Sequence, residues 1–320
     1  MKSSSRFFPA RLMSAEVFGQ YAEDVYLLKP NNSPDKSVEL AVTHLTRVGA
    51  AVGKVPLVLV HGLHQNKCMW ASEASSVGER LVEAGFDVWM FECRGHGHSP
   101  VNAGYEQNTM ADYARYDIPA VNMFVAEQTA CAVNWLGDGA GGGALLFALV
   151  MGALEEQSLG KVVGVGVPFY NARWSRVPGV SSLLMARRLR SVEASGPERE
   201  PMSLMSALVK ENHWLASRGA FAGVDLWAEL EVLSRGWKWL APESSVSQFN
   251  TDFSRLSAEV RADCLVELPS EGVQSDANGS SLWNADKSLV DGLVLRLQRL
   301  LGVEGEFNNV SPVGASSPAV

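Results

Sequence analysis

Apolar runs alternate with helical segments between residues 55 and 168, and this alternation constrains the fold more than any other feature. Strands are expected at 55–60, 87–92, 132–136 and 162–167, because each is a short apolar run bounded by turn residues. Continuous apolar runs are typical of strands that are covered on both faces. Strands that alternate with helices require crossover connections, so we expect an α/β fold with a mostly parallel sheet and helices on both faces.

The flanking regions extend this pattern. Two further strands are expected at 25–28 and 38–45. The region 170–258 is polar, helical in pattern and rich in tryptophan, which predicts a helical insertion over the sheet. One more strand is expected at 264–268, followed by an amphipathic helix over 289–301. No later strand is evident, so the sequence does not show how the sheet ends.

The chain therefore divides into a core, an insertion and two terminal segments. The core is expected to consist of residues 21–169 and 259–303, with the helical insertion at 170–258 between them. Residues 1–20 are predicted to be a flexible leader. Residues 304–320 are rich in serine, proline and glycine and are predicted to be a disordered tail.

Composition excludes several classes of protein. Of the 320 residues 47% are hydrophobic, which is enough for a full core and excludes wholesale disorder. Asp and Glu (35) outnumber Lys and Arg (27), and no basic stripe is present, so nucleic acid is not expected as a partner. The longest uncharged run, 139–154, is shorter than the roughly 18 to 20 residues of a membrane-spanning helix.

The N-terminal residues indicate the cellular compartment in which the protein is expected. They contain serine and basic residues but no apolar run long enough for a signal peptide, so we expect a cytoplasmic protein. The same composition, without an acidic residue before Glu16, keeps an organelle transit peptide as the alternative.

No cofactor or metal is expected. The four cysteines are far apart and form no Cys-x-x-Cys pair, which argues against a structural zinc site. His96 and His98 have no third ligand near them in sequence. The glycine-rich segment 137–143 lacks the Gly-Lys-Ser/Thr ending of a phosphate-binding loop.

Three motifs follow the expected strands in a fixed order. His61-Gly62-Leu63 follows the first, Arg94-Gly95-His96-Gly97-His98 follows the second, and a Gly-x-x-x-Gly-Gly turn follows the third. Together they resemble the α/β-hydrolase fold family over roughly residues 36–168. The segment 116–121 is most similar to the lipase, esterase and polyester-synthase branch. The resemblance implies that the helical insertion is a lid.

The glycine turn resembles the nucleophile elbow of that family. A sharp strand-to-helix turn needs small neighbours, and Gly137 and Gly141 occupy those positions. Gly142 allows the helix to pack close to the strand. The family places its nucleophile, usually serine, at the apex. Here the apex is Gly139 and the preceding residue is Asp138. Glycine has no side chain, so the family's nucleophilic chemistry has no reagent at this position.

The other members of a catalytic triad are also incomplete. The family's histidine follows the last strand, and none of the six histidines here follows Cys264. Asp276, in the loop after that strand, is the candidate for the acid. Backbone N–H groups of Leu63 and Ala140 are the candidates for an oxyanion hole, which needs no catalytic side chain.

The loop after the first strand has its own expected role. His61 and Gly62 are expected to shape it, with His61 forming a hydrogen bond that braces the loop. A ligand pocket is expected at the elbow, lined by His61, Leu63, Asp138, Gly139 and lid aromatics.

Three hypotheses follow. The first is a catalytically degenerate lipase- or esterase-like protein that binds a small acyl or other apolar ligand, or a protein partner. The second is an active ester hydrolase or acyltransferase with a relocated nucleophile, Asp138 or Cys93. The third is a non-catalytic subunit of an active homologue, with the tryptophan-rich insertion as its contact face.

Overall fold

A computed structural model describes residues 4–72, 77–166, 187, 196–207, 220–221, 223–268 and 287–303. The strands of its central sheet are β1 (Ala10–Phe18), β2 (Tyr21–Leu28), β3 (Leu40–Arg47), β4 (Val55–Val60), β5 (Phe86–Glu92), β6 (Val133–Asp138), β7 (Leu159–Val165), β10 (Trp237–Pro242) and β11 (Leu265–Leu268). The remaining described strands, β8 (Ala220–Phe221) and β9 (Val224–Asp225), form a separate hairpin.

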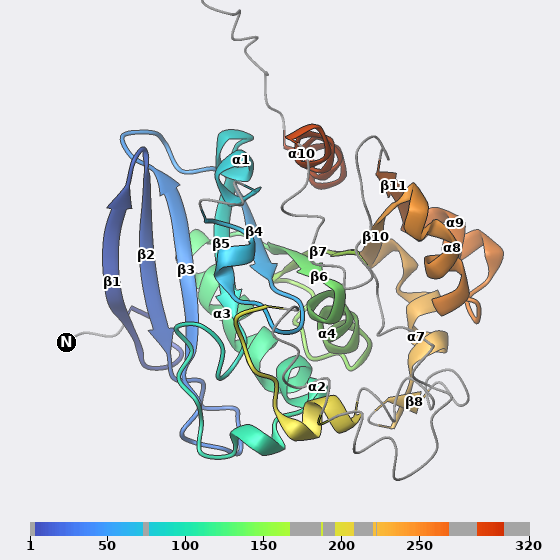
Figure 1. Cartoon of the computed structure of the whole chain (residues 1–320), viewed down its shortest axis with the longest axis horizontal. Helices are drawn as coiled ribbons and strands as arrows, with labels where there is room; N and C mark the ends of the chain where they lie inside the picture. Colours follow the sequence, from blue (N-terminus) through green and yellow to red (C-terminus); the bar gives the residue numbers. More distant parts are fainter. Residues whose placement is uncertain are drawn as a thin grey trace, which may run out of the picture.

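The sheet has the order β1-β2-β3-β5-β4-β6-β7-β10-β11 (Figure 1). The first strands, up to the pair β3–β5, are antiparallel neighbours, whereas the strands from β5 to β11 are all parallel. The mostly parallel sheet predicted from the alternating pattern is therefore confirmed.

Helices cover both faces of this sheet. The longer ones are α1 (Val77–Glu83), α3 (Ile118–Thr129), α4 (Gly139–Val150), α7 (Leu226–Val232), α8 (Glu243–Asp252), α9 (Ala258–Cys264) and α10 (Lys287–Leu301). Short turns of helix are α2 (Met110–Asp112), η1 (Lys67–Met69), η2 (Tyr105–Gln107), η3 (Tyr113–Asp117) and η5 (Ser234–Gly236). In Figure 1, α1 and α10 lie on one side of the central strands, and α2, α3 and α4 lie on the other.

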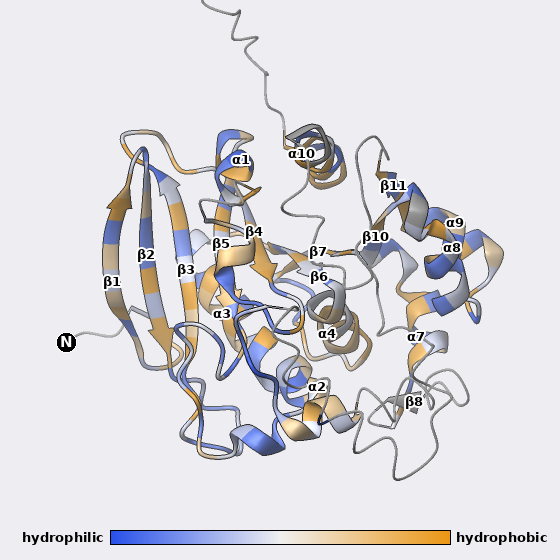
Figure 2. Ribbon diagram, viewed as in Figure 1, coloured by the Kyte–Doolittle hydropathy of each residue, from blue (hydrophilic) through white to orange (hydrophobic). Residues whose placement is uncertain are grey.

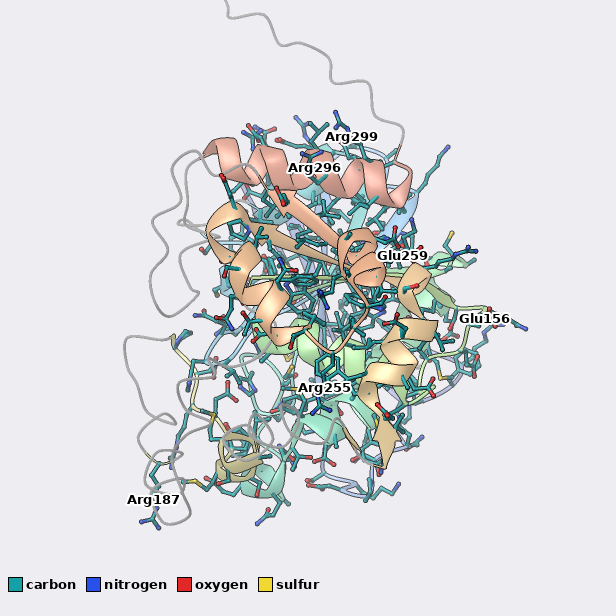
Figure 3. The ribbon with its side chains drawn as sticks, turned by 90° about the vertical axis from the view of Figure 1, so that its right-hand side faces the viewer. Glu156, Arg187, Arg255, Glu259, Arg296 and Arg299 are labelled. Atoms are coloured by element: carbon teal, nitrogen blue, oxygen red, sulfur yellow. The ribbon has the colours of Figure 1, made fainter. Side chains whose placement is uncertain are left out.

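Side-chain alternation along β4 divides the core in two. Leu57 and Leu59 join the cluster that contains α1 and α10, whereas Val58 and Val60 join the cluster that contains α3 and α4. Successive side chains of a strand point to opposite faces, so an uninterrupted apolar run is required where both faces are covered. Figure 2 shows this apolar character along β4. Glu259 of α9 and Arg299 of α10 lie on the outside of the molecule (Figure 3).

The predicted flexible leader is wrong in part, because residues 10–18 form β1. This strand pairs with β2 along its whole length through a tight turn at Gly19, whose φ is +59°. Most of its side chains are exposed, so it lacks the alternating apolar pattern that marks a half-buried strand. Backbone pairing with β2 forms the strand, and the local sequence gives no signal of it.

The predicted helical insertion is also wrong in part, because residues 237–242 form β10. This strand lies between β7 and β11 and is parallel to both, so the sheet continues beyond β7. Trp237 and Trp239 are completely buried in it. Two tryptophans in a short stretch do not distinguish a strand from a buried helix, and tertiary contacts decide between them. Residues 167–186, 188–195, 208–219 and 304–320 of the insertion and tail lie outside the described residues.

Within the described ranges, no helix is both long enough and apolar enough to cross a bilayer.

The packing of β7 against β10 gives a stability prediction. A Cβ added at Gly164 would lie 2.1 Å from the ring of Trp239, which is fixed by burial and by a hydrogen bond from its Nε1 to the carbonyl of Gly166. We expect Gly164→Ala to lower the free energy of unfolding by about 1–3 kcal/mol, the usual cost of overpacking. Denaturant unfolding measures this change.

Gly236 provides the matched control. A Cβ there would meet nothing within 4 Å. Gly236→Ala should change stability by less than about 1 kcal/mol. Equal effects of the two substitutions would contradict the packing described for Trp239.

Candidate functional site

The elbow is a sharp turn between β6 and α4. β6 ends at Asp138, and α4 begins at the next residue, Gly139, which has a φ of +45°. This is the left-handed region that glycine adopts at no steric cost and other residues adopt with strain. Gly139 therefore lies where the sequence places the apex.

The neighbouring glycines allow three backbone segments to approach one another. A Cβ at Gly137 would lie 2.5 Å from the amide nitrogen of Gly142, and a Cβ at Gly142 would lie 2.8 Å from the carbonyl oxygen of Gly137. A Cβ at Gly141 would lie 2.4 Å from the carbonyl oxygen of His61. The start of α4 is therefore packed directly against β6 and against the loop that follows β4.

His61 fixes that loop through both nitrogens of its ring. Its Nε2 accepts a hydrogen bond of 3.0 Å from the backbone N–H of Cys93, so Nδ1 carries the proton and donates to the carbonyl of Gly62 at 2.8 Å. Burial, followed by the nearby charge of His96, lowers the pKa of His61 to about 4. The ring is thus a neutral brace between the loops after β4 and β5.

Asp138 lies on the side of the elbow that faces this loop. A Cβ at Gly62 would be only 2.4 Å from Oδ2 of Asp138. The carboxylate therefore rests against the backbone of Gly62 and remains partly exposed. His61 and Gly62, from the loop after β4, and Asp138 and Gly139, from the elbow, come together here.

Cys93 is close to this group, but its environment disfavours the reactive thiolate form of its side chain. Its side chain is buried, and burial, together with the charges of Asp117 and Glu200, raises the pKa of the thiol well above 9.0. The neighbouring histidines do not activate it: His96 lies 3.2 Å from Glu200 and His98 lies 2.9 Å from Glu92. The geometry does not form a Cys–His dyad.

Glu200 is the residue that sequence reasoning missed. It lies in the stretch Gly196-Pro197-Glu198-Arg199-Glu200, which resembles an ordinary solvated charged segment. In the fold its carboxylate is buried, accepts a hydrogen bond from the backbone N–H of His64 and pairs with His96. No local pattern in the sequence distinguishes Glu200 from the other charged residues of this stretch.

The His96–Glu200 pair is charged on both sides. Burial opposes both charges, but the mutual attraction outweighs it: the pKa of Glu200 is lowered to about 2, and that of His96 is raised. His96 also faces the carbonyl oxygen of Arg94 with its other ring nitrogen, at 3.2 Å. Both nitrogens therefore face acceptors, as a protonated imidazole requires.

A second buried ion pair anchors the loop after β5. The guanidinium of Arg94 binds both carboxylate oxygens of Asp117, with a distance of 2.8 Å between Nε and Oδ2. Both side chains are almost completely buried. Two parallel bonds fix the orientation of the loop relative to η3 and α3.

Comparisons with known proteins agree with this geometry. Residues 55–128 match the family described as alpha/beta hydrolase fold. Human Lipase member M is 32% identical over 124 residues, which cover 36% of this chain and 27% of that protein. Mouse Lipase member M is 28% identical over 181 residues, covering 53% and 41%. The chain thus spans less than half the length of these relatives.

Solved structures extend the similarity to most of the chain. An esterase from Thermogutta terrifontis superposes with a TM-score of 0.51 at 16% identity, covering 86% of this chain and 98% of that one. The hypothetical protein PA2218 from Pseudomonas aeruginosa gives 0.54 at 12% identity, covering 94% and 96%. At these identities the likeness concerns the fold.

This chain has an α/β-hydrolase fold.

The α/β-hydrolase fold explains the position of the elbow, whose apex residue, Gly139, has no side chain. Asp276, the candidate acid, lies outside the described residues, as do residues 170–186, 188–195, 208–219 and 222 of the predicted lid. Among the described residues, no cluster of three or more His, Cys, Asp or Glu side chains could hold a metal ion.

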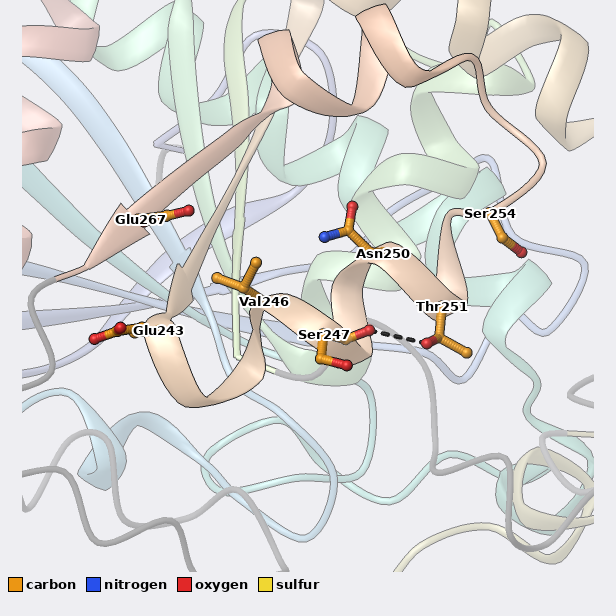
Figure 4. A pocket seen from close by; sticks show the side chains of 7 residues that line it. All are labelled: Glu243, Val246, Ser247, Asn250, Thr251, Ser254 and Glu267. Carbon is orange, nitrogen blue, oxygen red and sulfur yellow. Dashed lines mark hydrogen bonds between the residues drawn. The ribbon is translucent and has the colours of Figure 1, made fainter.

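One hollow among the described residues lies away from the elbow. It measures about 830 Å³ and runs along the outer side of α8 beside β11 (Figure 4). Its walls are mainly polar, with Glu243, Ser247, Asn250, Thr251, Ser254 and Glu267 among the lining residues. The predicted apolar pocket at the elbow stays a prediction, since residues 170–186, 188–195 and 208–219 of its lid lie outside the described residues.

The bonds of His61 predict its titration. We expect the ring to stay neutral until the pH falls to about 4, because charging it requires a buried cation and breaks the bond from Cys93. Its folded pKa is below the ordinary value of 6.5, so its contribution to stability is full above about pH 6.5 and is lost as the pH falls through about 4.

Histidine-ring NMR spectra across the pH range measure this. His98 is the internal comparison, because its hydrogen bond with Glu92 raises its pKa above 6.5. A midpoint for His61 near 6.5 would contradict the neutral brace.

Proposed function

We propose that this lipase- and esterase-like protein has lost the hydrolytic chemistry of the fold and binds an acyl or other apolar ligand beside its elbow. The observation that carries the proposal is Gly139 at the apex, with a φ of +45° and no side chain. A covalent acyl intermediate needs a hydroxyl, thiol or carboxylate at the point of attack. The protein therefore keeps the sharp turn but has no nucleophilic side chain at its apex.

The histidines that surround the elbow support the same conclusion. The lone pair of His61 Nε2 is occupied by the N–H of Cys93, and its pKa of about 4 makes it a weak base. His96 and His98 are paired with buried carboxylates. None of these rings is arranged to take a proton from a nucleophile at the elbow.

The class of ligand is inferred from the relatives and the surroundings. Similar proteins bear the names gastric triacylglycerol lipase and lysosomal acid lipase/cholesteryl ester hydrolase, which describe acyl esters. Leu63 and Ala140, on the two sides of the elbow, both pack against the apolar core cluster. An acyl chain fits this combination of apolar side chains and backbone N–H groups.

A relocated nucleophile remains the second candidate, because Asp138 is partly exposed and rests against Gly62 beside the elbow. Cys93 is a weaker candidate, since it is buried and its raised pKa disfavours the thiolate. The subunit hypothesis gains no support from Trp227, Trp237 or Trp239, which are buried.

Ligand binding is the direct test of the first proposal. A long-chain fatty acid should raise the melting temperature, because a ligand at about 100 times its Kd stabilises the folded state by about 2.7 kcal/mol. Differential scanning fluorimetry measures the shift, and native mass spectrometry measures the stoichiometry. Acetate, which has the carboxylate but no chain, is the control. No shift and no adduct with any chain length would contradict an acyl ligand.

Restoring the missing hydroxyl tests the loss of chemistry. We expect Gly139→Ser to give at most weak ester hydrolysis without a burst, because removing triad members typically costs about 10⁴- to 10⁶-fold in rate. Both Gly139→Ser and the control Gly139→Ala should lose about 1–3 kcal/mol of stability, the cost of a side chain at a positive φ. Turnover of p-nitrophenyl esters and labelling by a fluorophosphonate measure the activity.

Two results would overturn the degenerate assignment. Stoichiometric labelling of Gly139→Ser would show that a base serves the elbow after all. Rapid turnover by the wild-type protein, abolished in Asp138→Asn, would assign the reaction to the relocated carboxylate.

A further inference from the structure

Residues 196–200, here called the latch, hold together the loops that follow β4 and β5. In Figure 1 the segment runs, in yellow, past the ends of these strands. Two contacts join Glu198 to His64. The backbone N–H of Glu198 donates a hydrogen bond to the carbonyl oxygen of His64 at 3.0 Å, and Nδ1 of the His64 ring lies 3.2 Å from the carbonyl oxygen of Glu198. The latch is therefore bound to the loop 61–66 through its backbone.

The side chain of Glu198 joins the two loops directly. Its Oε1 accepts hydrogen bonds from Nδ2 of Asn66, at 2.7 Å, and from the backbone N–H of Gly97, at 3.0 Å. Gly196 fits so closely that a Cβ there would lie 2.1 Å from the carbonyl oxygen of His64. These contacts fix the latch in one position against the two loops, and the close fit at Gly196 leaves no space for the segment to slide along them.

The deepest contact of the latch is the ion pair between Glu200 and His96. Their side chains are 2% and 1% exposed. Burying one charge without the other is strongly unfavourable, so this position of the latch is stable only while Glu200 is ionised and His96 is protonated. Glu200 also accepts the backbone N–H of His64, which connects the state of the pair to the loop 61–66.

We propose that the latch is a pH-dependent device: it is closed while His96 is protonated, and it opens when His96 loses that proton and frees the loop 61–66 beside the elbow. This regulation of ligand access rests on the function proposed above, whereas the opening itself does not. Leu204, just beyond the latch, is completely buried in the core, so opening is local.

Besides His96, two groups of this region titrate near neutral pH: burial raises the pKa of Asp117 to about 6, and the hydrogen bond with Glu92 raises the pKa of His98 above 6.5. The Glu200→Gln and His98→Gln variants below separate the response of His96 from theirs. Charged and titratable groups surround His96 on all sides. They come from every neighbouring element: His61 and His64 after β4, Glu92, Cys93 and Arg94 at the end of β5, Tyr113 and Asp117 in η3, and Glu198 in the latch. His61 stays neutral, Arg94 is paired with Asp117, and Glu92 is paired with His98. Burial keeps the thiol and the phenol protonated, because it raises the pKa values of Cys93 and Tyr113.

The direction of the pH effect follows from the two pKa shifts. The pKa of His96 is raised above 6.5, so its contribution is full below about 6.5 and is lost as the pH rises through the folded value. The pKa of Glu200 is lowered from 4.5 to about 2, so its contribution is full above about 4.5 and is lost as the pH falls toward 2. The latch is most stable between these limits and opens on the alkaline side.

Hydrogen–deuterium exchange of the full chain tests the latch without any ligand. Between about pH 6 and about pH 9, protection of peptides covering 196–200 and 61–66 should fall about tenfold or more after correction for intrinsic exchange, since one pKa unit corresponds to a tenfold change in population. Peptides from β4 and β6 serve as the internal reference.

Two variants complete the test. Glu200→Gln should abolish this pH dependence, because the amide cannot stabilise a charged His96. His98→Gln removes the other His–Glu pair of the same loop and should retain the pH dependence. Protection of the latch that does not change with pH in the wild-type protein, or a Glu200→Gln profile identical to the wild type, would overturn the proposal. A protein that binds no acyl ligand would still show the opening.

Discussion

The close approach of three backbone segments is the constraint on which the rest of the site depends. β6, the first turn of α4 and the loop after β4 lie so near one another that a Cβ at Gly137, Gly141 or Gly62 would fall within 2.5 Å of a neighbouring atom. Any side chain there would separate the segments. Because the segments touch, Asp138 rests against the loop, and the apex Gly139 is held at its positive φ.

Buried charge provides the second level of organisation. Hydrogen-bonded ion pairs fix the loops at the carboxyl ends of β4 and β5. Arg94 binds Asp117 to orient one loop, and Glu200 binds His96 and the backbone of His64 to join both. Such pairs contribute little net stability compared with apolar packing, but breaking one leaves an uncompensated charge, so each permits one arrangement only.

The backbone shape of the elbow site does not depend on the side chains that would carry out a reaction there. Backbone geometry and small residues form the sheet order and the sharp turn, and the ring of His61 braces the loop after β4. None of these features requires a side chain that takes part in catalysis. A site can therefore lose its nucleophile and keep its shape, which is why the fold alone does not establish an activity. The histidines near the elbow illustrate the same point, since their ring nitrogens brace loops.

The sequence by itself determined the parallel core and the elbow, because both depend on local patterns. Apolar runs that alternate with helices specify crossovers, and a strand followed by Gly137 to Gly142 specifies a tight turn with Gly139 at its apex. Only the tertiary structure decided that residues 10–18 and 237–242 are strands. The first strand is exposed and is formed by backbone pairing with β2, and the second is formed by pairing with the distant strand β7. It also decided the burial of Glu200, because the carboxylate is favourable there only once His96 and the N–H of His64 meet it in space.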